Sequence, residues 1–410
     1  MNRLHKMQCF GLTMIAALIM PLTAATEVDF SAVSGLEVRA FTESGSYAQD
    51  DYTGSVFIEP EWFFELDESV FSLKVFGRYD SADSERTHFD IREAYWQKVG
   101  DEWSLTVGIN KVFWGVAETQ HLVDIINQTD AVENLDGEDK LGQPMINFNW
   151  EKDWGTLSLF ALPGFRERTF PGPDGRLRFE FPIATDNAQY ESAQEQSHID
   201  WAARFSKVMG VWDLGFSAFR GTSREPLLQL DLQTGDLNPY YPQITQFGID
   251  AQATIDSWLW KVEYIYRRGF ALPSSDAASD YSAAVAGFEY SFYGVADTAI
   301  DVGWILEYQF DERDRLGSAG FSIELSDIVV TGARLTFNDV QSSDLLIGLG
   351  FETDNDARFI SIEGSRRVGD DLKLALEGRL FNGVKNDPFA TLFYSYRNDS
   401  FVQVTLEKYF

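Results

Sequence analysis

The residues best suited to chemistry are three histidines, His88, His121 and His198. No His-Glu-x-x-His zinc motif, Gly-Lys-Ser/Thr phosphate loop or Gly-x-Ser-x-Gly elbow accompanies them. His198 could join a triad assembled from neighbouring strands, but a solvated histidine at a strand edge is the simpler alternative. The acidic run Asp136-Gly137-Glu138-Asp139 lacks the regular spacing of a calcium loop. We therefore expect no enzyme, no cofactor and no metal site.

Charged side chains follow a different pattern, in which they alternate with apolar ones along segments of about ten residues. In 258–267, apolar Trp260, Val262 and Tyr264 alternate with Lys261 and Glu263. Charges in the middle of a strand need water on one face, as in the lumen of a membrane barrel. The pore-lining candidates are Lys74, Arg78, Lys261, Glu263, Arg267, Arg334, Glu377 and Arg379. Because acids and bases on these faces nearly cancel, cross-channel ion pairs that brace the wall are the alternative to a selectivity ring.

The segment 114–142 carries a further set of candidates. After Trp114 it continues with a mildly helical, partly apolar stretch at 121–126. Asp124, Asn127 and Asp130 are expected to line a constriction if this loop folds into the lumen. The alternative is an outer loop that packs against its neighbours.

The elements that must position these residues are long strands. Alternation with a period of two recurs from 56–66 to 401–410, and no stretch of this part resembles a transmembrane helix. The segments are about ten to thirteen residues long, which suits a tilted strand that crosses a bilayer. Aromatic residues gather near segment ends, as in membrane girdles; they are Trp62, Trp103, Trp114, Trp150, Trp258 and Tyr266. The pattern predicts an all-β, transmembrane, antiparallel up-and-down barrel of 18–20 strands, the weakest strand being 321–325.

The connections between segments alternate between short and long. Tight turns are expected near 67–68, 100–102, 153–155, 209–211, 256–257 and 293–294, and long polar loops at 114–142, 165–197, 222–243 and 269–279. Outer-membrane barrels carry short turns on the periplasmic side and long loops outside the cell. We therefore expect the long loops to be extracellular.

Composition and the first residues narrow the class. The 410 residues include 64 acidic and 33 basic side chains, a formal charge of −31, which argues against nucleic-acid binding. Basic Arg3 and Lys6, an apolar run and small residues up to Ala25 resemble a secretory signal. We expect residues 1–25 to be a signal peptide for Sec-type export and 26–410 to form one barrel. The only cysteine, Cys9, would leave with the signal.

The last segment, 401–410, alternates and ends on Phe410. Here the sequence resembles the terminal strand of Gram-negative outer-membrane proteins, and the resemblance implies that Phe410 is read by the barrel insertion machinery. Lys408 departs from that pattern. The sequence also resembles a porin-like family of uncharacterised function, in the positions Gly108, Trp114, Gly115, Asp124, Asn127, Asp130, Thr336, Phe337, Asn338, Asp339, Arg366, Arg367, Tyr409 and Phe410.

That resemblance implies a porin-like barrel without naming a substrate. The leading expectation is an outer-membrane channel for small polar solutes, surrounded by lipid and lipopolysaccharide. The alternative is a non-conducting barrel that acts in envelope assembly, in adhesion or as a barrel hydrolase, with its lumen plugged by the loops at 165–197 and 222–243. The oligomeric state stays open.

Overall fold

The computed structural model describes residues 28–271, 280–313, 327–353, 356–383 and 392–410. Eighteen strands of this part form one sheet. They are β1 Val28–Phe41, β2 Tyr52–Leu66, β3 Ser69–Asp80, β4 His88–Val99, β5 Trp103–Asn110, β6 Gln143–Lys152, β7 Gly155–Pro163, β9 Ile199–Met209, β10 Trp212–Thr222, β13 Gln243–Ile255, β14 Trp258–Arg268, β15 Tyr281–Phe292, β16 Asp301–Asp311, β17 Ile328–Thr336, β18 Asp344–Glu352, β19 Arg358–Val368, β20 Leu372–Asn382 and β21 Phe401–Tyr409.

Each of these strands pairs antiparallel with the next strand of the sheet along the chain. The last strand, β21, pairs with β1, so that the sheet has no free edge. The predicted up-and-down barrel is confirmed, and the number of strands is the lower end of the predicted range. Closure satisfies the backbone hydrogen bonds of every strand, which a structure inside a bilayer requires.

The alternation of side chains decides which face of each strand points outward. In β14, Trp260, Val262, Tyr264 and Tyr266 are exposed, whereas Glu263, Ile265 and Arg267 between them are buried inside the barrel. The same rule exposes Val56 and Ile58 of β2 and Trp304 and Tyr308 of β16. The outer wall is therefore mostly apolar and aromatic, and the charged residues in the middle of the strands point inward.

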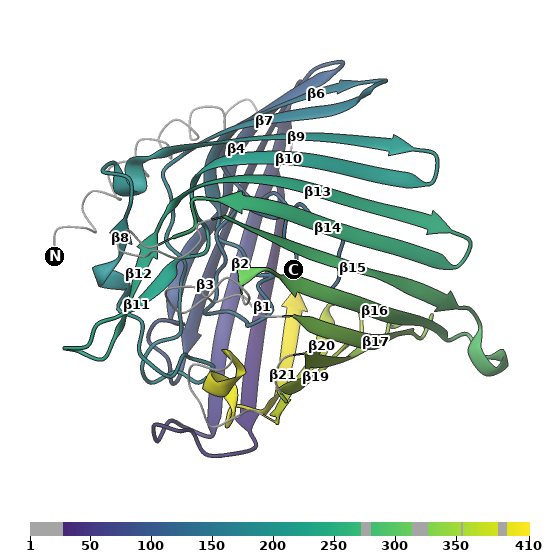
Figure 1. The fold of residues 1–410 in the computed structure, drawn as a ribbon. Coiled ribbons are helices and arrows are strands. Elements are labelled where there is room, and N and C mark those ends of the chain that lie inside the picture. The colour runs from purple at the N-terminus through teal and green to yellow at the C-terminus, as the bar shows by residue number, and fades with distance from the viewer. Residues whose placement is uncertain (1–27, 272–279, 314–326, 354–355, 384–391) are drawn as a thin grey trace.

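Short turns and long loops lie at opposite ends of the barrel, as the sequence predicts, although the tight turn expected near 293–294 is an eight-residue connection, 293–300. The two-residue turn after Ile255 contains Asp256, and that after Met209 contains Gly210, both with positive φ, of 53° and 64°. At the other end lie the loops 111–142, 164–198 and 223–242. In Figure 1 the hairpin turns β9–β10 and β13–β14 extend to the right, and the loop strands β8, β11 and β12 gather at the left.

The loops carry short elements of their own. A second sheet consists of β8 Gln189–Tyr190, β11 Leu227–Leu230 and β12 Leu237–Tyr241. The 3₁₀ turns are η1 Thr185–Asn187, η2 Glu195–Ser197, η3 Val295–Asp297 and η4 Leu392–Tyr396. Within the described ranges, no helix has the length and apolarity to cross a membrane.

Two expectations about individual segments are wrong. Residues 121–126 form turns without a helix, because their polar backbone groups bind partners in the wall. Trp114 is buried, with its ring 5.5 Å from that of Phe160, so it packs in the interior and does not belong to a membrane girdle. The predicted signal peptide and the weak strand at 321–325 fall outside the described residues.

A charge on the outer wall is predicted to destabilise the barrel in a bilayer. Ile249 of β13 is exposed between Phe216 of β10 and Tyr264 of β14. Ile249→Arg should lower the free energy of unfolding in phospholipid vesicles by about 2–4 kcal/mol, because the guanidinium meets hydrocarbon. The matched control is Gln252→Arg, on the inward face of the same strand, which should change it little. Equal effects in urea titrations would contradict the assignment of the two faces.

Candidate functional site

The loop 111–142, here called the crossing loop, lies inside the barrel. Its residues contact β3 and β4 on one side and β14 and β16 on the other. In the closed order of strands, β14 and β16 are about half a turn away from β3 and β4. The loop therefore spans the lumen from wall to wall.

The first attachment is made by Glu263 of β14, whose side chain is fully buried. Its Oε1 accepts the backbone N–H of Val116 at 2.7 Å and of Ala117 at 2.9 Å, and its Oε2 accepts that of Val123 at 3.2 Å. Gly115 has a φ of 138°, and a Cβ there would lie 2.9 Å from Glu263 Oε1. Gly115, which lacks a Cβ, thus lets the loop backbone approach the carboxylate of Glu263.

The second attachment is made by Glu307 of β16. Its carboxylate accepts the N–H of Glu118 at 2.8 Å and both the N–H and the hydroxyl of Thr119, at 2.9 and 2.6 Å. The Glu118 side chain pairs with Lys261 at 3.1 Å and with Arg334. Burial opposes ionisation of Glu118, but these two cations outweigh it and lower its pKa.

On the opposite wall, arginines of the strands hold acids of the loop. Arg92 of β4 lies 2.7 Å from Asp130, and Arg78 of β3 lies 2.7 Å from Glu133. Burial alone would raise the pKa of Asp130, but contacts with His88 and the charge of Arg92 lower it to about 2. Asp130 is therefore an anion in the interior, held by neighbouring cations.

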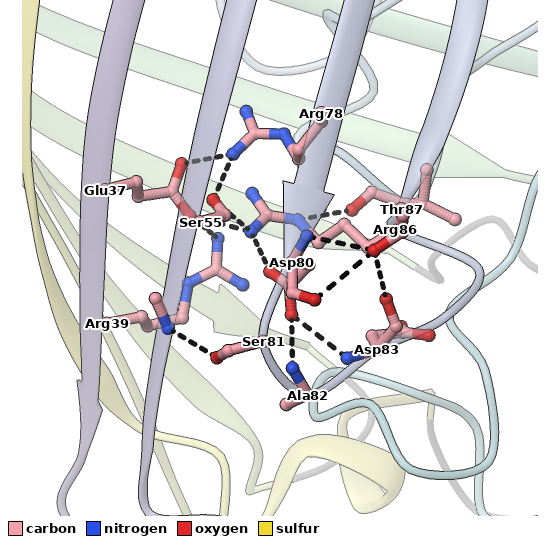
Figure 2. A network of polar contacts seen from close by, with 12 residues as sticks. Glu37, Arg39, Ser55, Arg78, Asp80, Ser81, Ala82, Asp83, Arg86 and Thr87 are labelled. Carbon is pink, nitrogen blue, oxygen red and sulfur yellow. Dashed lines mark hydrogen bonds and ion pairs between the residues drawn. The ribbon is translucent and has the colours of Figure 1, made fainter.

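Arg78 belongs to a larger network at the long-loop ends of β1–β3 (Figure 2). It pairs with Glu37 at 3.1 Å, and Arg86 bridges Glu37 at 2.8 Å and Asp80 at 2.9 Å. Arg86 also donates to the carbonyl of Val132 at 3.0 Å. Since each of these charges is buried, removing one would leave its partner uncompensated.

A third contact joins the crossing loop to β20. Asn134 donates to both oxygens of Glu377 at 3.3 Å, and Arg379 lies 3.5 Å from Asp136. Arg379 also pairs with Glu363 of β19 at 2.8 Å. Six of the eight wall candidates from the sequence thus bind the crossing loop directly; they are Arg78, Lys261, Glu263, Arg334, Glu377 and Arg379.

The three loop candidates are buried in contacts with protein groups. Asp124 accepts the N–H of Trp114 at 3.3 Å, lies 3.3 Å from Lys140, and has a raised pKa because it is buried. Asn127 accepts the N–H of Val112 and donates to the carbonyls of Asn110 and Leu141. These contacts fix the path of the loop. A role of the three residues in lining a constriction stays a prediction.

Apolar contacts with the wall also hold the crossing loop in place. Val123, Ile125 and Ile126 are buried in one cluster with the inward-facing wall residues Phe160 and Leu162. Arg224, from the loop 223–242, donates to the carbonyl of Ile126 at 3.1 Å and pairs with Asp200 at 2.6 Å. The crossing loop is thus covered by the neighbouring outer loops.

The remaining candidates lie away from the crossing loop. Lys74 pairs with Glu61 at 2.8 Å across β2 and β3. Arg267 pairs with Glu225 at 3.1 Å. Phe410 follows β21 at the seam, where its N–H donates to the carbonyl of Ala32 at 3.0 Å. Its part in barrel insertion stays a prediction.

Three important partners were missing from the sequence-based candidates: Arg92, Glu133 and Glu307. All three lie far along the chain from the groups they bind. The signal available in the sequence was opposite charge, because a loop with many acids faces two wall strands that carry Arg78 and Arg92. Backbone amides that bind a carboxylate leave no such signal in a sequence.

The three histidines all lie beside carboxylates. His121 is 2.8 Å from Glu138 and His198 is 2.8 Å from Asp200, and no serine hydroxyl hydrogen-bonds to a histidine in the described ranges. His88, Asp130 and Glu133 stand close enough together to suggest metal ligands. Arg92 and Arg78 already pair with those two carboxylates, which favours an ion-pair network over a cation site.

Comparison with known proteins identifies the fold. No protein family and no curated protein matches the sequence. Wzi of Escherichia coli, described as an outer-membrane protein involved in group 1 capsule assembly and as a carbohydrate-binding β-barrel, matches with a TM-score of 0.53. The identity is 12%, over 96% of this chain and 87% of Wzi. A variant of the Rhodopseudomonas blastica porin matches with a TM-score of 0.43 and 14% identity, over 94% of this chain and all of the porin. The chain therefore has the fold of outer-membrane barrels, as its resemblance to a porin-like family implies.

Neutralising Glu263 is predicted to loosen the crossing loop. A hydrogen bond to a charged group contributes about 1.5–3 kcal/mol, so Glu263→Gln should speed exchange of the Val116, Ala117 and Val123 amides roughly ten- to a hundredfold. Hydrogen exchange followed by mass spectrometry measures this. Glu61→Gln, which breaks the pair with Lys74, is the matched control. Unchanged exchange in Glu263→Gln would contradict the attachment.

The low pKa of Asp130 gives a second prediction. A carboxyl group whose pKa falls on folding adds stability above its unfolded value, near 4, and this stability is lost as the pH falls towards about 2. The carboxyl carbon of Asp130 should titrate near pH 2 by NMR in micelles, and Arg92→Gln should raise that midpoint. A midpoint near 4 in the unsubstituted protein would contradict the contact.

Proposed function

We propose that this protein is an outer-membrane barrel closed to free diffusion by its crossing loop, and that it acts in the envelope through its outer surface. The observation that carries the proposal is the attachment of one loop to both walls, by Glu263 and Glu307 on one side and by Arg92 and Arg78 on the other. A barrel of 16–18 strands otherwise leaves an aqueous channel. In this barrel the crossing loop fills the lumen.

The apolar outer wall and the fold support a place in an outer membrane. Exposed apolar side chains surround the ring of strands, and water is a poor solvent for such a surface. With the long loops outside the cell, as in other outer-membrane barrels, the closed end faces the surroundings. Sec-type export and a Gram-negative envelope belong to this proposal.

A surface polysaccharide is the partner class that we propose, by analogy with the description of Wzi as a carbohydrate-binding barrel. The outer loops meet in a shared surface that supplies aromatic, basic and acidic groups. Tyr47 is exposed and donates its hydroxyl to the carbonyl of Glu180 at 2.9 Å, and Arg397 pairs with the side chain of Glu180 at 2.6 Å. Such groups combine apolar contact with hydrogen bonding, as ligand sites require.

A selective channel for small polar solutes is the second candidate, and one observation favours it. Wall charges nearer the short turns stay accessible: Arg334 is 38% exposed, whereas the side chain of Asp130 beneath the outer loops is fully buried. The half of the lumen towards the turns therefore contains water. In this alternative the crossing loop would have to move to admit a solute.

Conductance in planar bilayers separates the two candidates. The unmodified barrel should give no open-pore steps, because the loop obstructs the lumen, and replacing 116–139 with a short Gly/Ser link should produce ohmic steps. Shortening the exposed tip 231–236, between β11 and β12, is the control and should leave the barrel closed. Ohmic steps from the unmodified protein would contradict the proposal, as would silence after the crossing loop is replaced.

A further inference from the structure

Two arginines lie near each other on the outward face of the barrel, close to its long-loop end. Arg220 of β10 is paired in register with Thr245 of β13, and Thr245 is paired with Arg268 of β14. Since neighbouring strands lie about 4.8 Å apart, the two arginine Cα atoms are about 10 Å apart. Thr245 stands between them.

The alternation of side chains places all three residues on the outer wall. Arg220 follows exposed Phe216 at a spacing of four, Arg268 follows exposed Tyr266 at a spacing of two, and Thr245 precedes exposed Phe247. On the far side of Arg220, its register partner Trp201 of β9 is also exposed. A guanidinium beside such residues is stable at the depth of lipid headgroups, where tryptophan also gathers, and not in hydrocarbon.

The two guanidinium groups have donors to spare. Arg220 is exposed and makes no hydrogen bond or ion pair with the described part of the chain. Arg268 is 62% exposed and donates its Nε to Asp280 at 3.3 Å. Asp280 offsets the charge of Arg268. The group of Arg220, Thr245 and Arg268 therefore keeps a local positive charge, although the formal charge of the whole chain is −31.

This combination fits a phosphate group. Guanidinium forks match the spacing of phosphate oxygens and bind them through charge-assisted hydrogen bonds. The hydroxyl of Thr245 supplies a third donor between the two arginines. At headgroup depth on the side of the long loops, the phosphates within reach are those of the outer leaflet.

We propose that Arg220, Thr245 and Arg268 bind a phosphate of lipopolysaccharide, the phosphorylated glycolipid of that leaflet. The inference rests on the outer-membrane location and orientation proposed above, and it does not depend on whether the lumen is closed. It assigns a lipid site to β10, β13 and β14.

Retention of lipid A by the full-length barrel in detergent tests the site. Native mass spectrometry should show that the unmodified barrel retains lipid A carrying both phosphates in preference to lipid A from which they were removed. Arg220→Gln with Arg268→Gln should reduce that retention by about tenfold, since charge-assisted hydrogen bonds are lost. Inorganic phosphate at the same concentration should not displace the lipid.

The matched control is Arg358→Gln. Arg358 is an exposed arginine on β19 between Phe351 and Asn382, on a different part of the wall. This variant should retain lipid A as the unmodified protein does. Heat-dependent migration in gels shows that each variant is folded, and Arg220→Gln alone replaces the double variant if the latter does not fold.

Equal retention of the two forms of lipid A by the unmodified barrel would overturn the proposal. So would a loss of lipid A retention in Arg358→Gln as large as that in the double variant, or displacement of the lipid by inorganic phosphate. A barrel that conducts ions but still discriminates the two lipids would contradict the closed lumen and leave this site standing. The two proposals therefore fail separately.

Discussion

A ring of eighteen strands encloses more space than the side chains of its own wall can fill, and the interior of this protein is organised around that constraint. The crossing loop occupies the space, which brings backbone N–H groups into a region where water is scarce. Each buried N–H then needs an acceptor. Glu263 and Glu307 supply carboxylates to the amides of 116–119 and 123, and each carboxylate accepts hydrogen bonds from more than one of these donors.

The attachments differ between the two sides of the barrel. On β14 and β16 wall carboxylates accept backbone donors of the loop, and Lys261 pairs with Glu118 of the loop. On β3 and β4 the wall supplies arginines and the loop supplies Asp130 and Glu133. Buried ion pairs add little net stability when they form, but losing one partner is costly. This arrangement defines one position for the loop, because a shifted loop would leave charges unpaired on both walls.

The barrel could be predicted from the sequence because its determinants are local. In β14 the alternation of Val262, Tyr264 and Tyr266 with Glu263 and Arg267 already separates the two faces, and Asp256 and Gly210 mark turns. The interior could not be predicted in the same way. Trp114 follows a strand, as a girdle residue would, and only its packing on Phe160 shows that it is internal. The contacts between Glu118 and Lys261 join residues far apart in the sequence, and the amides of Val116 and Ala117 carry no signal of their acceptor.

The central claim is that a single loop is attached to opposite walls at the same time, and short-range cross-linking tests it most directly. In a chain whose only cysteine, Cys9, is replaced by serine, one cysteine pair replaces Thr119 and Gln309 of β16, hydrogen-bonded at 2.8 Å, and a second replaces Asp130 and Arg92 of β4, which lie 2.7 Å apart on the opposite wall. In bilayers, a short thiol-specific cross-linker should join both pairs in the same molecule. Failure of either pair to react in a folded barrel, while its single cysteines remain reactive, would contradict a loop that crosses the lumen.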